Sequence, residues 1–480
     1  MWFLLRGIST RLVAVYKKFI IFFVILALPT GVMLAKYIPQ VMNLADGFVS
    51  RFIDAIVFLA PVAIFMILAP SLAKMLKTRK ESSFAGFVIF WFGLTRIAAG
   101  IWAAIFTVII LKLPLLPNSQ AADINLGQLI TQNLITLKDL MFKSVFFGAI
   151  WASIIVGIVA YYKKKLFNLL QKASDSIELL GNYIEPAIPV LMLLLGAYIY
   201  SLPQTLAESV STETMNSIAQ ANLGKVSFLG FAIDINSEFG LLWVYIIGSV
   251  SIGIGCFIWQ AIQIIIVKKY IGDFSIKDFF RNYWAKVYPL AWSTSSEVIS
   301  MPLNMALIKT HYNKIERIVR RLVIGLGAYM NINGTTMHVI LLAGIVSVLV
   351  GFEPSLFQLC LGVPIIAIIG YGVPGIPGEL VLFAVPMVKI LNLPEPLIAL
   401  FMSLYLALQI GLPDSFRTGA NVTDNGIYAV GLNKLYKNRF STKNRTEKQN
   451  NLQVMWKKIV STQVVRIKET RDRKRKAEKR

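Results

Sequence analysis

The sequence predicts an all-α polytopic membrane protein. Its 480 residues have a mean hydropathy of +0.65, and only 15% of them are charged. A soluble protein of this length needs a more polar surface, which argues against a large soluble α/β enzyme with buried strands. Apolar runs of about 20 residues recur along the chain, as expected for helices that cross a bilayer.

Six apolar runs precede residue 270. The N-terminal stretch MWFLLRGISTRLVAVYKK has no small-residue cleavage site, so the run that follows it is predicted to be a retained span and not a signal peptide. Each run is long enough for a membrane-spanning helix. The runs fall near residues 19–39, 51–73, 84–112, 141–162, 184–202 and 240–267.

Beyond residue 270 the apolar pattern is interrupted by Gly, Pro, Ser and Asn. The interrupted segments are 275–310, 316–351, 353–391 and 394–432. Lys and Arg in short loops mark the cytoplasmic side, and the basic loops here are 75–80, 161–167, 267–272 and 309–321. The loops 117–128 and 204–217 are not basic.

These charges alternate consistently only if two segments enter the membrane and return to the same side. The first is a hairpin from the cytoplasm with its tip at WSTSSEVISMP (292–302), and the second enters from outside with its tip at GYGVPGIPG (370–378). The prediction is eight transmembrane helices plus two re-entrant helical hairpins, arranged as inverted repeats, with both termini inside. A channel built from re-entrant loops is the structural alternative.

Polar residues gather inside the C-terminal half. In PDSFRTGANVTDN (413–425), Asp414, Arg417, Asn421 and Asp424 are spaced by three, four and three, which places them on one helix face. An arginine fork suits a carboxylate, and an aspartate suits an ammonium group. A zwitterion clamp is therefore predicted, and an internal salt bridge between Asp414 and Arg417 is the alternative.

A second polar motif, MNINGTTMH (330–338), interrupts another span. Its Asn, Gly and Thr residues are able to unwind a helical turn and direct carbonyl groups toward a cation. A packing kink is the alternative.

No motif indicates an enzyme or a disulfide. Cys256 and Cys360 lie within apolar runs, and no HExxH, CxxC or P-loop pattern occurs. From Lys437 to Arg480 there are 16 Lys/Arg against 4 Asp/Glu. A nucleic-acid arm and a solvated tail attracted to anionic lipid both fit such a run, and the lipid interpretation is favoured in a polytopic protein, with no nucleic acid as partner.

Four motifs occur in an order that resembles the dicarboxylate/amino acid:cation symporter family, the glutamate-transporter fold. They are STSSEVISMP, NINGTT, GVPG and DSFRTGANVTDN. The resemblance is specific from residue 290 to 425, and over roughly residues 15–435 it rests on topology. It implies a homotrimer with an elevator mechanism and no resident cofactor.

The resemblance also implies a domain organisation. Residues 1–18 form a cytoplasmic segment, and 19–270 hold spans 1–6, of which spans 3 and 6 join the transport core. Residues 271–437 complete the core with hairpin 1, span 7, hairpin 2 and span 8, and 438–480 form the basic tail. The second hairpin is implied to be the gate.

Site residues follow from the same resemblance, position by position. Arg417 is similar to the arginine that holds a side-chain carboxylate, Asp414 would hold an amino group, and Asn421 an α-carboxylate. The other implied substrate contacts are Ser296, Glu297, Thr335, Thr418 and the backbone of Val373 and Gly375. The implied cation site, or its remnant, comprises Thr95, Arg96, Asn331, Asn333, Asn421 and Asn425.

Several residues depart from the family pattern. Asn333 and Asn425 stand where the family has carboxylates that hold sodium, and Asp424 is one position away, about 100° around an ideal helix. Arg96 stands where the family has a small hydroxyl residue, so its guanidinium is a candidate replacement for the ion. The alternative is that Arg96 faces the scaffold or a lipid headgroup. Sodium coupling is therefore in doubt.

Glu297 stands where the family has serine. Three interpretations are open: it pairs with Arg417 in the empty carrier, it carries a proton, or the substrate is no longer acidic. The proton is favoured because burial raises a carboxyl pKa.

The prediction is a symporter for acidic amino acids or C4-dicarboxylates such as glutamate and aspartate, driven by H⁺ or Na⁺, in a bacterial inner membrane. The alternatives are a neutral amino acid carrier or exchanger, and a substrate-gated anion conductance.

Overall fold

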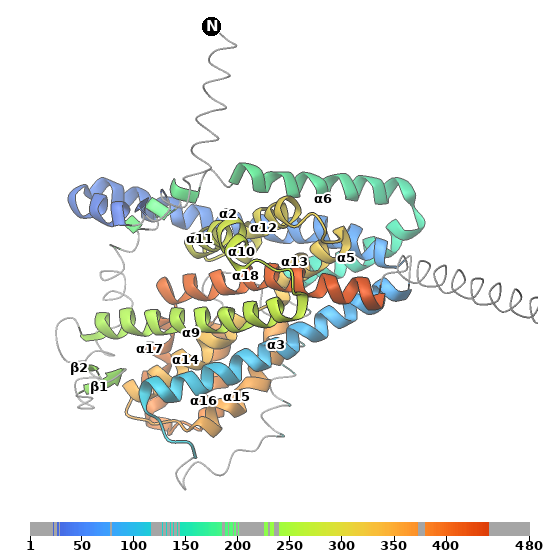
Figure 1. The fold of residues 1–480 in the computed structure, drawn as a ribbon. Helices are drawn as coiled ribbons and strands as arrows, with labels where there is room; N and C mark the ends of the chain where they lie inside the picture. Colours follow the sequence, from blue (N-terminus) through green and yellow to red (C-terminus); the bar gives the residue numbers. More distant parts are fainter. Residues whose placement is uncertain are drawn as a thin grey trace, which may run out of the picture.

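The computed structural model of the chain is mainly helical (Figure 1). It describes residues 29–76, 79–116, 145–184, 225–228, 231–234, 240–372 and 380–440, together with scattered positions elsewhere. The predicted N-terminal segment 1–18, the loop 204–217, the loop 117–128 apart from Gly127, residues 373–379 and the tail beyond residue 440 lie outside the described residues.

Three described helices are long and apolar enough to cross a membrane: Ser83–Leu111, Leu242–Ile271 and Arg317–Leu349. A fourth candidate is the pair Glu395–Leu408 and Leu412–Phe440, whose axes differ by 65°. The helices therefore support an integral membrane protein, but within the described part of the chain they do not account for eight separate spans.

One group of helices comes from the first part of the chain. α2 (Pro39–Met75) packs along α5 (Val145–Tyr162), and both contact α6 (Lys164–Ile184). The prediction placed a short basic loop at 161–167, but α6 begins at Lys164. Its polar residues recur along one face of the helix, which is the pattern of an amphipathic surface helix.

The long helices α3 (Arg79–Leu111) and α9 (Gly240–Ile271) belong to a second group. α9 lies beside α18 (Leu412–Leu435), and α3 packs against α14 (Asn333–Leu349) (Figure 1). An antiparallel hairpin of β1 (Lys225–Phe228) and β2 (Phe231–Asp234) precedes α9, and the all-α prediction missed it. Its apolar residues alternate, as in a two-stranded hairpin with a short turn.

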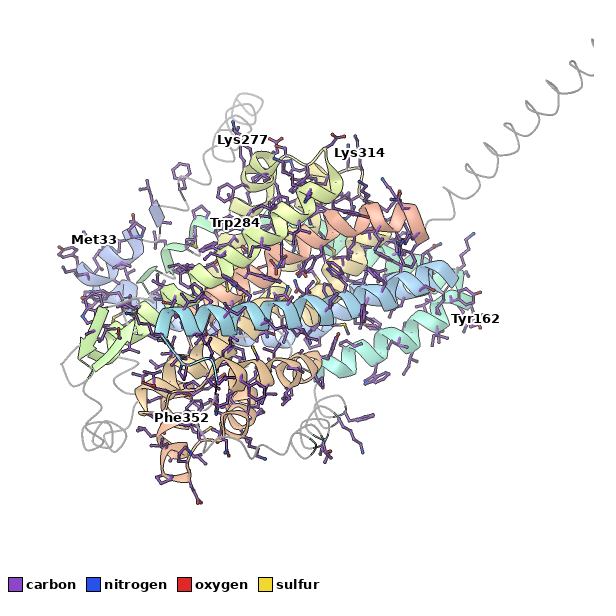
Figure 2. The ribbon with its side chains drawn as sticks, turned by 60° about the horizontal axis from the view of Figure 1, so that its bottom comes forward. Met33, Tyr162, Lys277, Trp284, Lys314 and Phe352 are labelled. Carbon is purple, nitrogen blue, oxygen red and sulfur yellow. The ribbon has the colours of Figure 1, made fainter. Side chains whose placement is uncertain are left out.

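The first interrupted segment forms a pair of helices. α10 (Ile276–Phe279) and the π-helical η3 (Phe280–Trp284) lead into α11 (Ala285–Thr294), and α12 (Glu297–His311) returns. Lys277 and Lys314, which flank the pair, both lie at the upper edge of the molecule in Figure 2, whereas Phe352 lies at the lower edge. The chain thus enters and leaves the pair on one edge.

α13 (Arg317–Met330) and α14 then form a span that is broken at residues 331–332, in the NINGTT motif. The second half repeats this order. α15 (Leu356–Ile369), the 3₁₀ turn η4 (Gly370–Gly372) and α16 (Val381–Leu391) precede the bent pair of α17 (Glu395–Leu408) and α18, which ends in the π-helical η5 (Tyr436–Phe440).

Two apolar cores hold these elements together. One joins α3 and α9 to α14–α17, and the other joins α11–α13 to α18. α18 contacts both, so its polar face lies at the boundary between the two cores. Cys256 and Cys360 are free thiols, and Cys256 is buried in the first core.

An ionic contact connects the two groups of helices. Asp175 on α6 accepts hydrogen bonds from Arg317 and Arg321, which stand in the first turns of α13. Partial burial works to raise the pKa of Asp175, but the hydrogen bonds and positive charges of the two arginines outweigh it and hold this pKa below its usual value.

Replacing Asp175 with asparagine should lower the unfolding temperature slightly at pH 7. The aspartate is 44% exposed, so its ion pairs are worth only about 0–1 kcal/mol each. Because the folded-state pKa is lowered, this stabilisation is complete above the unfolded pKa of Asp and is lost as the pH falls through the folded value. Thermal unfolding of both proteins should therefore differ at pH 7 and converge in acid; a constant difference would contradict the ion pair.

Candidate functional site

Two helices, α12 and α14, begin beside the third turn of α18, where Asn421 stands. Glu297 is the first residue of α12, Gly334 is in the first turn of α14, and α18 begins at Leu412. Asn421 joins them: its Oδ1 accepts from the Gly334 N–H at 2.6 Å, and its Nδ2 donates to Glu297 Oε1 at 2.8 Å. Helix N-termini carry partial positive charge, so their convergence favours an anion.

Arg417 lies at this convergence with no exposed surface. Its Nε donates to Asp414 Oδ1 at 2.5 Å and its Nη1 to Thr335 Oγ1 at 2.8 Å. Thr335 Oγ1 also accepts from Asn421 Nδ2 at 3.0 Å. The internal Asp414–Arg417 salt bridge, one of the two sequence-based alternatives, is therefore present. This salt bridge holds the Arg417 guanidinium in place, and the same guanidinium is able to bind a ligand carboxylate as well.

The serine-rich tip is closed by its own hydroxyl groups. Thr294 Oγ1 donates to the Leu290 carbonyl at 2.8 Å, Ser295 has a left-handed φ of 44°, and Ser296 is the N-cap of α12. Ser295 Oγ also lies 3.2 Å from Ser415 Oγ on α18. The hydroxyl groups thus hydrogen-bond to backbone groups at the ends of α11 and α12 and connect the tip to α18. The side chain of Glu297 accepts a hydrogen bond from Asn421.

The two amides at the implied cation positions, Asn333 and Asn425, have different partners. Asn425 Oδ1 accepts from Asn331 Nδ2 at 2.8 Å, whereas Asp424 Oδ2 accepts from Asn333 Nδ2 at 2.8 Å and from Gln263 Nε2 at 3.0 Å. The Asp424 carboxylate therefore belongs to the α9 side of α18. It contacts Asn333, one of the two positions where the family has a carboxylate, whereas the other, Asn425, pairs with Asn331.

Arg96 on α3 is fully buried inside the second group of helices. Its guanidinium donates to the backbone carbonyls of Met330 and Ala367, in the last turns of α13 and α15, and its Cζ lies 4.3 Å from the ring centroid of Tyr371. These carbonyls are at the negative ends of two helices. The alternative in which Arg96 faces a lipid headgroup is wrong.

The remaining predicted residues take different positions. Thr418 is buried on α18 beside Arg417, and Thr95 Oγ1 donates back into its own helix, to Trp91 and Phe92. Val373 and Gly375 lie outside the described residues.

Sequence reasoning missed several polar partners. Gln260 Nε2 donates to Asp424 Oδ1 at 3.2 Å, and it stands three residues before Gln263 on α9. Two amides three residues apart in the apolar run IWQAIQIII indicate that α9 has a polar partner at this position, because polar groups at bilayer depth need hydrogen-bonding partners. The contact of Tyr371 with Arg96 has no signal in the sequence.

The comparisons agree with the geometry. Residues 225–435 match the model of the Sodium:dicarboxylate symporter family, from β1 to the end of α18. A search of curated proteins found no match to this chain. The matched segment holds Glu297, Thr335, Arg417 and Asn421, the residues that meet at the start of α14. Residues 225–435 therefore match a family of transporters, the sodium:dicarboxylate symporter family, and the long apolar helices indicate an integral membrane protein.

Proposed function

We propose that this protein is a secondary active transporter of acidic amino acids or C4-dicarboxylates such as glutamate, aspartate or succinate. The observation that carries the proposal is the position of Arg417, which is fully buried in the second turn of α18 and donates to Thr335 in the first turn of α14. A buried guanidinium near the N-termini of α12 and α14 offers positive charge and directed N–H donors, which suits a ligand carboxylate.

The implied sodium positions lack the family's two carboxylates, although the amide oxygens of Asn331 and Asn333 are buried without a hydrogen-bond donor among the described residues. Sodium is held by anionic or carbonyl oxygens, but Asn425 uses its amide oxygen to accept from Asn331, and Asn333 directs its NH₂ group toward Asp424 and toward Tyr428 Oη, 2.6 Å away. Arg96 already places a positive charge on the carbonyls of Met330 and Ala367. We infer that a fixed guanidinium replaces one coupling ion.

A proton is then the favoured coupling ion, and Glu297 is the favoured carrier. Its carboxylate is 1% exposed and acts electrostatically on Arg96 and Tyr329. Ionised Glu297 repels an anionic substrate, whereas protonated Glu297 removes that repulsion and leaves Asn421 as a hydrogen-bonding partner. Substrate and proton would therefore enter together.

The packing supports a scaffold and a moving core. α2, α5 and α6 pack on one another, and they contact the remaining helices through α12, α13 and α3. In the proposal they form the scaffold of a homotrimer, the other helices move as an elevator core, and the basic loops and both termini face the cytoplasm of a bacterial inner membrane.

The test is uptake of radiolabelled aspartate, glutamate, succinate and serine into proteoliposomes. We expect uptake of the first three in sodium-free medium when the outside is acidic, and little uptake without a proton gradient. An absolute requirement for sodium would contradict the coupling proposal, and absence of uptake of any acidic substrate under both gradients would contradict the function.

Glu297→Gln tests whether Glu297 carries the coupled proton. Wild-type uptake should rise as the pH falls, because protonation removes the repulsion, and the variant should bind substrate at every pH as the wild type does in acid. Glu395→Gln, an exposed carboxylate in the first turn of α17, is the matched control and should leave the pH profile unchanged. A Glu297→Gln variant with the original pH profile would assign the proton elsewhere.

A further inference from the structure

Three polar side chains near Arg417 have no hydrogen-bonding partner among the described residues. They are His338 on α14, Tyr405 on α17 and Thr418 on α18, and each is fully buried. Both ring nitrogens of His338, the hydroxyl of Tyr405 and the hydroxyl of Thr418 are unpaired within the described part of the chain. Buried polar groups are rarely left unpaired because each costs free energy, so this cluster requires an explanation.

The three side chains approach Arg417 from different helices. His338 follows Thr335 by three residues, which puts both on one face of α14, and Thr335 Oγ1 accepts from Arg417. His338 and Tyr405 both interact electrostatically with Arg417. α14 packs on α17 and α18, and Thr418 is the next residue to Arg417 on α18, about 100° around the helix.

The chemistry of the cluster suits a carboxylate. A second buried cation beside Arg417 would be costly, so the imidazole is neutral and offers one N–H donor. The hydroxyls of Tyr405 and Thr418 offer two more donors. A guanidinium that supplies the charge and neutral groups that supply directed hydrogen bonds together recognise a carboxylate and reject a neutral side chain.

We propose that His338 and Tyr405, with Thr418, form a specificity subsite that hydrogen-bonds the carboxylate bound by Arg417. The subsite selects substrates with a second carboxylate over substrates with one. This inference rests on the proposed transport function and deepens it, because it assigns part of the preference for dicarboxylates to His338 and Tyr405, which lie outside the four motifs.

The test is equilibrium binding of succinate, aspartate and serine to the purified full-length protein. For Tyr405→Phe and His338→Ala we expect the affinity for succinate and aspartate to fall about 10- to 100-fold each, the loss expected for one hydrogen bond to a charged group. Binding of serine, which lacks the second carboxylate, should stay within about twofold. His338→Gln keeps an N–H donor and should recover part of the affinity.

Stability without ligand separates this role from a structural one. The hydroxyl of Tyr405 has no partner in the described residues, so Tyr405→Phe should unfold at the same or a higher temperature than the wild type. Tyr436→Phe, just beyond the other end of α18, is the control for binding and should not alter affinity for any of the three ligands.

The outcomes distinguish the two proposals. The subsite is overturned, and the transport function stands, if the wild type binds succinate or aspartate and both variants bind them with the same affinity. The same conclusion follows if the variants' affinity for serine falls as much as their affinity for the acidic ligands. If the wild type binds neither acidic ligand, the proposed function is overturned and the subsite with it.

Discussion

Arg417→Lys should reduce uptake of aspartate and succinate by at least about 100-fold. Arginine holds Asp414 and Thr335 through two different nitrogens, and its planar fork leaves a carboxylate within reach of the same group. Lysine keeps the charge but is a point donor on a flexible stem, and it cannot serve these partners and a ligand at once. Loss of a bidentate contact worth about 3 kcal/mol corresponds to this factor.

The Arg417→Lys experiment requires separate measures of folding and uptake. The variant keeps a cation beside Asp414, so it avoids the cost of an unpaired buried carboxylate, which is about 3–5 kcal/mol. Unfolding temperature in detergent and uptake in proteoliposomes are measured on the same preparation. Arg281→Lys, an exposed arginine in η3, is the control and should transport normally. Wild-type uptake by a well-folded Arg417→Lys protein would show that the carboxylate binds elsewhere.

Patterns in the sequence predicted much of the backbone around the site. Gly, Pro, Ser and Asn interrupt apolar runs because they end helices, and the structure breaks at Ser295–Ser296, at residues 331–332 and at Gly411, which has a φ of 83°. Each of these helix breaks is caused by residues at the break itself. The order of a helix pair followed by a broken span, repeated once, was therefore predictable from these interruptions together with the Lys and Arg residues of the short loops.

The contacts of the buried polar groups were less predictable. The spacing of α18 places Asp424 on the face of Arg417 and Asn421, yet it contacts Gln260 and Gln263 on α9. Helical spacing gives the direction of a side chain around its own helix, but its hydrogen-bonding partner depends on which other helix packs against that face. Arg96 could not be assigned its partners from sequence either, because they are backbone carbonyls, which occur at every residue. The β1–β2 hairpin was missed because its strands are too short to be distinguished from the neighbouring apolar residues.

Gly334→Ala should destabilise the protein by more than any other glycine-to-alanine change along α14. A Cβ at this position would lie 2.3 Å from the Arg417 carbonyl oxygen, well under the 3.0 Å that real Cβ contacts reach. The obstacle is backbone on both sides, so α14 and α18 must move apart. Overpacking of this kind costs about 1–3 kcal/mol, and here it also stretches the 2.6 Å hydrogen bond from the Gly334 N–H to Asn421.

The same displacement separates Thr335 from Arg417, so substrate binding should fall together with stability. Gly86→Ala on α3 is the matched control, because a Cβ there meets nothing within 4 Å and alanine is the better helix former by about 1 kcal/mol. The control should unfold at or above the wild-type temperature and bind normally. Equal unfolding temperatures for Gly334→Ala and the wild type would mean that α14 and α18 do not approach this closely. Loss of stability without loss of binding would mean that the contact is structural and that the site does not depend on the register of these two helices.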